Sequence, residues 1–218
     1  MYIAAIDTNI EWTILKTVGT KIIFSNNQMS IPKSMKDSRE RLNRDSWLAL
    51  ALDVLAEEGR AKIKIEYLAK RLGVTKGSFY SHFSDRRDFI ASVSLYWADT
   101  LTATVLENLS QSEGDPEEKL LLLMQTIKNQ KIDRYDIVMR SWALDEPLVA
   151  DQVKKVDRVR FEYIKSLFTE MGFVGEELEM RSMIFQVYHS LSNALQGTFF
   201  EENRFKNDHL RRKFFTRK

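Results

Sequence analysis

The sequence has no cysteine and few residues that interrupt helices, with three prolines and eight glycines among 218 residues. The absence of cysteine excludes disulfides, a thiol nucleophile and a cysteine-held zinc site, and is typical of proteins from a reducing cytosol. A sandwich or barrel of short strands needs turn residues at intervals of roughly 8–12 positions, yet residues 115–171 contain no glycine. The sequence therefore predicts an all-α fold.

Long apolar runs are missing as well. No segment approaches the roughly 20 consecutive apolar residues that a membrane-spanning helix needs, so we expect no membrane association and a cytoplasmic protein. Residues 1–35 show no helical period and no basic segment followed by an apolar core, so they do not resemble a secretory signal. We expect this extension to be disordered or dispensable, or to reflect a start codon placed too far upstream.

Charge is distributed unevenly, although the net charge is only +2. Residues 41–87 carry ten basic and six acidic side chains, residues 88–203 eleven and twenty, and residues 204–218 seven and one. A basic head and a basic tail around an acidic body indicate a polyanionic partner at the ends. A merely solvated surface is the alternative that charge alone leaves open.

Apolar residues recur at helical spacing from Arg41 onward. A first helix should end at Gly59, and a later one should begin with the cap and first-position proline of Asp115-Pro116 and run to residue 131. Ser84 is the expected cap of a long helix that reaches residue 109. The other expected helices cover residues 64–72, 76–82, 133–144, 148–171 and 176–196.

Residues 64–83 carry the pattern that indicates a function. A helix-turn-helix needs a small residue in its first helix, a glycine in the turn, and apolar residues that hold the two helices at a wide angle. Ala69 and Gly73 occupy such positions, and Gly73 can adopt the left-handed conformation that ends a helix. Other helical proteins contain this generic pattern, so the residues that follow it are decisive.

The segment Leu-Ala-Lys-Arg-Leu-Gly-Val-Thr-Lys-Gly-Ser-Phe-Tyr-Ser-His-Phe, residues 68–83, resembles the tetracycline-repressor (TetR) family of bacterial regulators. The resemblance covers residues 41–95 strongly, and the remainder agrees in helical character and length. It implies a three-helix helix-turn-helix DNA-binding head (36–87), a helical-bundle body for ligand binding and dimerisation (88–203) and a basic tail (204–218). It also implies a homodimeric transcriptional repressor that a small molecule releases from a palindromic operator.

The N-terminus of a recognition helix enters the major groove, where side chains reach bases and phosphates. Hydroxyl, imidazole and cationic groups suit phosphate oxygens, whereas Phe79 and Phe83 should pack inward. Gly77 would leave room where the helix lies against DNA. Lys64 stands where the family has a capping Ser or Thr, and a lysine cannot accept that hydrogen bond. The expected DNA-binding residues are Arg44, Lys62, Lys64, Thr75, Lys76, Gly77, Ser78, Tyr80, His82 and Arg86.

The acidic body contains no catalytic motif, no metal-ligand spacing and no cofactor signature, so we expect no enzyme, no metal and no cofactor. Its aromatic and methionine side chains would line a cavity for an apolar or amphipathic effector, or would fill a solid core. The candidate ligand-binding residues are Trp97, Leu101, Met124, Met139, Trp142, Tyr188 and His189.

Two further interpretations remain open at this stage. An effector-independent architectural or interaction protein that binds DNA would show the same head, and a small helical enzyme would show a similar body. The apolar stripes on residues 148–171 and 176–200 exceed what one buried face needs, which predicts a four-helix dimer interface. The effector, the operator sequence and the sign of regulation are not encoded in any recognisable pattern.

Overall fold

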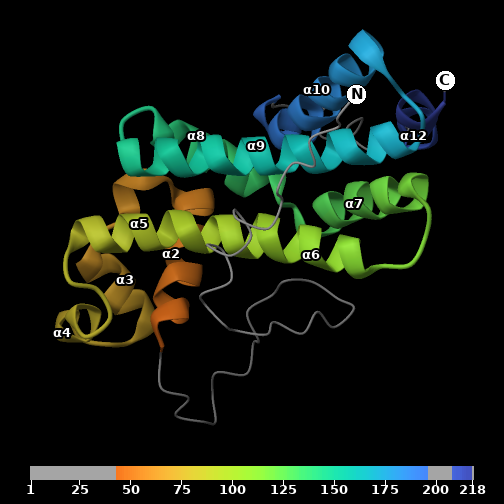
Figure 1. Ribbon diagram of the computed structural model, residues 1–218. Coiled ribbons are helices and arrows are strands. Elements are labelled where there is room, and N and C mark those ends of the chain that lie inside the picture. Colours follow the sequence, from red (N-terminus) through yellow and green to blue (C-terminus); the bar gives the residue numbers. More distant parts are fainter. Residues whose placement is uncertain (1–42, 196–207, 218) are drawn as a thin grey trace, which may run out of the picture. The chain divides into compact units, whose positions relative to one another are not determined.

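The computed structural model of the protein describes residues 43–195 and 208–217. Within these ranges the regular structure is entirely helical (Figure 1), which confirms the expected all-α fold. The expectation for residues 1–35 lies outside the described residues, as does the first part of the tail. The α-helices are α2 (Arg44–Glu58), α3 (Ile65–Leu72), α4 (Lys76–Tyr80), α5 (Arg86–Ala98), α6 (Thr104–Gln111), α7 (Pro116–Gln130), α8 (Asp133–Ala143), α9 (Pro147–Glu170), α10 (Gly175–Leu191) and α12 (Asp208–Thr216).

Local signals at the helix ends agree closely with these bounds. Asp115 caps α7 in a full capping box with Glu118, and Pro116 is the first helical residue. Gly59 ends α2 with φ of 82°. The expectation that Ser84 caps α5 was wrong by one residue. Asp85 is the N-cap, and its side chain accepts a hydrogen bond from the backbone N–H of Asp88.

A long helical segment links the head to the body. α5 continues through η2 (Asp99–Ala103), one turn of π-helix, directly into α6. By length and composition the segment 86–111 is able to cross a membrane, but 67% of its most apolar window is buried within the fold. Since it packs against α2 and α9, it serves here as a core helix.

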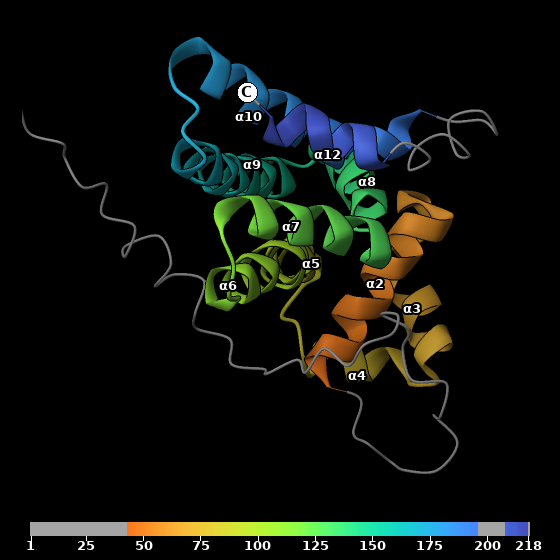
Figure 2. The same cartoon turned by 90° about the vertical axis from the view of Figure 1, so that its right-hand side faces the viewer.

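α9 is the central helix of the body and contacts α5, α7, α8 and α10. In both views it lies between α10 on one side and the α5–α6 segment on the other (Figures 1 and 2). The expected stripe of α9 is buried except for half-buried Phe161. Its buried members are Val149, Val153, Val156, Ile164, Leu167 and Phe168.

Part of the basic tail packs on the body as α12. Phe215 is buried, with its ring centroid 5.0 Å from that of Phe185 and 6.4 Å from that of Phe168. Arg181 of α10 donates to the carbonyl oxygens of Phe214 and Arg217 at 2.5 and 2.9 Å. These contacts place the described end of the tail against α9 and α10.

Candidate DNA-binding surface and effector cavity

α4 presents polar groups to solvent at its N-terminus. Thr75, Lys76 and Gly77 are exposed, Ser78 is half-buried, and Tyr80 is 54% exposed. These five expected DNA-binding residues therefore lie together on one short helix and its cap. A helix that exposes its N-terminal side chains in this way has the geometry of a recognition helix.

An aromatic cluster fixes α4 from behind. The buried ring of Phe79 packs with its centroid 5.4 Å from Trp47 of α2, 5.0 Å from Phe83 and 5.2 Å from Phe89 of α5. Phe83 is also buried, so the inward packing expected for both phenylalanines is confirmed. The contacts with Trp47 and Phe89 are edge-to-face, which holds the rings in defined orientations, and α4 is thereby anchored to two other helices.

The two glycines of the motif have different roles. Gly73 ends α3 in the left-handed conformation, with φ of 70° and ψ of 28°, as the sequence indicated. Gly77 has ordinary helical backbone, and among the described residues a Cβ added there would meet only the Thr75 Oγ1 at 3.6 Å. Because this part of the fold leaves room for a side chain at Gly77, packing against the described residues does not explain the glycine.

Lys76 forms an ion pair across the motif. Its Nζ lies 2.6 Å from Oε1 of Glu66 on α3, and both side chains are more than half exposed. The hydrogen bond from Lys76 lowers the pKa of the Glu66 carboxyl, and the pKa of Lys76 is correspondingly raised. Glu66 therefore competes with any phosphate for the Lys76 ammonium.

The remaining expected DNA-binding residues of the head differ in how exposed their side chains are. Lys64 is exposed and occupies the N-cap of α3 without a side-chain cap, as expected for a lysine at that position. Lys62 is exposed, with its Nζ 5.4 Å from the ring centroid of Tyr67. His82 is half-buried beside Phe83.

Arg44 and Arg86 begin α2 and α5. Arg44 is already engaged, since it donates to Ser92 Oγ at 2.5 Å and lies 3.6 Å from Asp88 and over the Phe83 ring. Its side chain is still 42% exposed. Arg86 is exposed at the start of α5, where it remains available to a partner.

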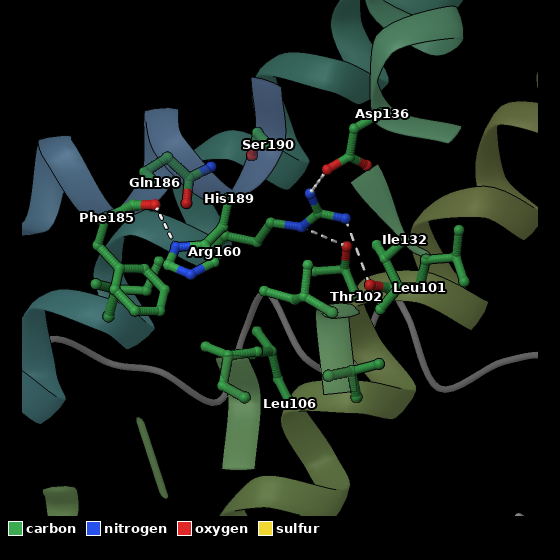
Figure 3. Close-up of a pocket in the computed structure, with 14 residues that line it drawn as sticks. Leu101, Thr102, Leu106, Ile132, Asp136, Arg160, Phe185, Gln186, His189 and Ser190 are labelled. Atoms are coloured by element: carbon green, nitrogen blue, oxygen red, sulfur yellow. Dashed lines mark hydrogen bonds and ion pairs between the residues drawn. The ribbon is translucent and has the colours of Figure 1, made fainter. Parts of the chain in front are cut away.

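The body contains a cavity of about 40 Å³ between η2, α6, α7, α8, α9 and α10. By the usual space that one water occupies, it holds only a few water molecules. Figure 3 shows polar and apolar side chains converging on it. Its apolar lining includes Leu101, Val105, Leu106, Ile132, Ile164 and Phe185, and its polar lining comprises Thr102, Asp136, Arg160, Gln186, His189 and Ser190.

A buried ion pair forms one wall of the cavity (Figure 3). Arg160 of α9 donates to Asp136 Oδ2 at 2.5 Å and to Thr102 Oγ1 at 2.9 Å. The side chains of Arg160 and Asp136 are only 12% and 2% exposed. Asp136 also accepts a hydrogen bond from Trp97 of α5, so the wall is connected to the helix that begins at the head.

His189 of α10 forms another part of the wall. Its Nδ1 lies 2.9 Å from the carbonyl oxygen of Phe185, and since a carbonyl only accepts, Nδ1 carries the proton. Burial lowers the pKa of His189 to about 3, so the ring is neutral. Its Nε2 is buried and has no hydrogen-bond partner among the described residues.

The structure distributes the expected ligand-binding residues over three places. Leu101 and His189 line the cavity. Trp97 is buried and donates a hydrogen bond to Asp136, which lines the cavity. Tyr188 lies on the outer face of α10 and is 37% exposed. The other three, Met124, Met139 and Trp142, are buried in the core but do not line the cavity.

Sequence reasoning missed Arg160 and Asp136, although a signal for both was present. Arg160 falls between Val156 and Ile164 on the buried stripe of α9, and Asp136 falls between Ile132 and Met139 on that of α8. A charged residue on a core stripe needs a partner, because an unpaired charge is rarely buried. The two stripes together could have indicated an internal ion pair, but this signal was not used.

The described residues are helical, and α3 and α4 form a helix-turn-helix that presents polar groups from an aromatic anchor, which is the arrangement of a helix-turn-helix DNA-binding protein. Residues 48–93 match the model of the bacterial regulatory proteins, tetR family. The protein has the domain and the fold of a TetR-family transcriptional regulator, as the resemblance of residues 68–83 implied. None of the curated proteins compared with the chain matches it in sequence.

Solved structures of similar fold cover most of the described chain. A TetR transcriptional regulator from Legionella pneumophila is 18% identical, with a TM-score of 0.61 over 83% of this chain and 97% of that one. A TetR transcription regulator from Haloarcula marismortui is 16% identical, with a TM-score of 0.61 over 79% and 95%. AibR, solved in complex with isovaleryl coenzyme A and operator DNA, is 12% identical, with a TM-score of 0.60 over 79% and 97%.

Proposed function

We propose that the protein is a homodimeric repressor that binds a palindromic operator through α4 and leaves it when a small molecule enters the body. The hydrogen bond from Trp97 to Asp136 carries this proposal, because it joins the cavity wall to α5. α5 begins directly after the helix-turn-helix, and its Phe89 packs on Phe79. A ligand that moves this wall would thus change the position of α4.

The expected division into a head (36–87) and a body (88–203) forms part of the proposal. α5 begins at Arg86 and contributes Phe89 to the aromatic cluster of the head. It then contributes Trp97 to the network beside the cavity. A rigid element that belongs to both parts is suited to transmit a displacement between them.

The outer face of α10 supports the homodimer. Residues at helical spacing on this face are large, apolar and 37–61% exposed. A contiguous apolar stripe of this kind marks an interaction surface, and a two-fold axis would pair it with its own copy. The stripe consists of Met180, Met183, Ile184, Val187, Tyr188 and Leu191, and Leu195, which follows α10, is also exposed.

DNA binding is tested with a duplex selected from random fragments by the purified protein. Affinity should fall steeply with salt, and each lost phosphate contact should flatten the log–log slope by about 0.9. Lys76→Ala and Tyr80→Ala should weaken binding without unfolding the head. Lys154→Ala, at an exposed lysine of α9 in the body, is the matched control. Wild-type affinity in both head variants would refute the assigned surface.

The small volume of the cavity favours a second candidate function, an effector-independent DNA-binding protein. The two functions differ in the response of buried Trp97. An effector that quenches its fluorescence and lowers operator affinity over the same concentration range supports the repressor. A broad compound screen in which no compound produces both effects supports the second candidate.

A further inference from the structure

We propose that the effector is an uncharged, largely apolar molecule, such as a phenol. Its one hydroxyl or N–H group donates a hydrogen bond to Nε2 of His189. This inference rests on the proposed function, because it names the ligand class of the same cavity. Three observations support it. Nε2 of His189 is a buried acceptor that receives no hydrogen bond from the described residues. The charged lining residues Asp136 and Arg160 are paired with each other, and the rest of the lining is largely apolar.

The acceptor is fixed by its surroundings. His189 is 6% exposed, and its Nδ1–H is held by the Phe185 carbonyl at 2.9 Å. A neutral imidazole carries one proton, so a proton on Nε2 would remove the hydrogen bond from Nδ1 to the Phe185 carbonyl. Nε2 therefore offers a lone pair, and a buried lone pair without a donor is costly. Figure 3 shows the His189 ring, with one nitrogen bonded to the Phe185 carbonyl, among the side chains that line the cavity.

The charges of the lining are already satisfied. Arg160 donates to Asp136, to Thr102 and, at 3.4 Å, to the carbonyl oxygen of Leu101. Asp136 accepts from Arg160 with one oxygen and from Trp97 with the other. An anion would have to displace Asp136, and a cation would have to displace Arg160. The cavity thus disfavours charged ligands, and the lone pair of His189 repels a carboxylate directly.

The size of the ligand follows from what lies beside the cavity. Gln186 and Ser190 line the 40 Å³ cavity and also a groove of about 340 Å³ between α8, α9 and α10. Met183, Val187 and Leu191 of the proposed dimer stripe line the same groove, so it lies at the proposed interface. Gln186 is held toward Asp157 by a hydrogen bond of 3.3 Å. We expect rotation of this side chain to join the two spaces and to make room for a single substituted ring.

The test compares p-cresol with 4-methylanisole, whose methylated oxygen accepts but cannot donate, and with 4-methylbenzoate, which is anionic. Binding to the full chain is measured by titration calorimetry and by Trp fluorescence. We expect p-cresol to bind about tenfold more tightly than 4-methylanisole, as for one hydrogen bond to a buried acceptor. We expect 4-methylbenzoate to bind most weakly. Equal binding of the first two compounds, tighter binding of the anion, or no binding of p-cresol overturns the proposal.

His189→Phe keeps an aromatic ring beside Phe185 and removes the acceptor. In this variant p-cresol should lose its advantage over 4-methylanisole, and a retained advantage contradicts the proposal. The nitrogen NMR signals of labelled wild-type protein give a readout that does not depend on the folding of the variant. p-Cresol should shift the Nε2 signal of His189 and leave Nδ1 nearly unchanged, and an unshifted Nε2 signal contradicts the proposal.

Operator binding separates this inference from the proposed function. If p-cresol binds with the Nε2 shift but the operator complex persists, the ligand class stands and release by an effector fails. If a charged compound releases the operator without shifting Nε2, release stands and the ligand class is overturned.

Discussion

The indole Nε1 of Trp97 donates a hydrogen bond of 3.2 Å to Oδ1 of Asp136. The two residues are 39 positions apart in the sequence, and both are almost fully buried. The same carboxylate is paired with Arg160, whose guanidinium carbon lies 5.6 Å from the Trp97 ring centroid. Three helices of the body therefore meet in one polar network. This network couples the packing of α5 to the cavity and makes its members sensitive to substitution.

Arg160→Met should destabilise the protein by about 3–5 kcal/mol, because it leaves the Asp136 carboxylate buried without its partner. Denaturation by urea measures the change in the free energy of unfolding. Lys155→Met, at an exposed lysine of the same helix, should have little effect. The double variant Asp136→Leu/Arg160→Met should recover much of the loss, and a double variant as unstable as the single one would contradict this account.

Gly77→Ala should separate folding from DNA binding. The free energy of unfolding should rise by about 0.5–1 kcal/mol, because alanine is the better helix former and its Cβ meets only Thr75 Oγ1 at 3.6 Å. Operator affinity, measured by fluorescence anisotropy, should fall by about tenfold if the helix lies against DNA at this residue. Unchanged affinity would show that this side of α4 does not face DNA.

Glu66→Gln should strengthen operator binding by about two- to fivefold. The substitution removes the carboxylate that holds the Lys76 ammonium at 2.6 Å, and exposed ion pairs of this type contribute little to stability. Thermal unfolding should therefore be nearly unchanged. Glu58→Gln, at a carboxylate bonded to Tyr67 and Arg71 rather than to Lys76, is the control, and equal gains in both variants would rule out release of Lys76 as the cause.

Met183→Glu and Val187→Glu should convert the dimer to a monomer at micromolar concentration. Both residues lie on the exposed stripe of α10, at 51% and 48% exposure, and an unpaired charge in a dimer interface is strongly unfavourable. Sedimentation velocity reports the change. Leu144→Glu places the same charge at an 84% exposed leucine outside the stripe and should leave the dimer intact. A wild-type monomer would refute the interface.

Acid should destabilise the fold through His189. Burial lowers its pKa from 6.5 to about 3 in the folded state, so the unfolded chain binds the proton first. Stability should be complete above pH 6.5 and fall by about 2 kcal/mol from this group between pH 7 and pH 5. Urea denaturation across this range should show a smaller acid loss in His189→Phe than in wild type.

Asp99 acts in the opposite direction, since burial raises its pKa to about 6. In the folded state it takes up its proton as the pH falls through about 6, before the unfolded chain does near 4, so it favours folding over this range. Because Asp99 is present in wild type and in His189→Phe alike, the difference between the two isolates the histidine. His209→Ala, at an exposed histidine of α12, should retain the full acid loss. Parallel curves for wild type and His189→Phe would contradict the assignment of a neutral, buried ring.

Local sequence determined the helices and the head. Capping residues such as Asp115, glycines such as Gly59 and Gly73, and apolar spacing act within one or two turns, so their effects can be read without knowledge of the rest of the chain. The error at the start of α5 is of this local kind, because Ser84 and Asp85 are both good caps. The expected helices 76–82 and 176–196 also end earlier, at Tyr80 and Leu191. Residues 68–83 also contained enough of the helix-turn-helix to indicate DNA binding.

Tertiary structure alone decided which residues form the internal polar network and which face of α10 is buried. The partner of Arg160 is 24 positions away, and the proton on His189 is placed by the Phe185 carbonyl. Spacing predicted that α10 has an apolar stripe, but a helix with apolar residues on two sides can turn either one inward. Here Phe185 and His189 face the core, and Met183 and Val187 face solvent. The choice depends on how α9 and α12 pack against α10, which no local pattern encodes.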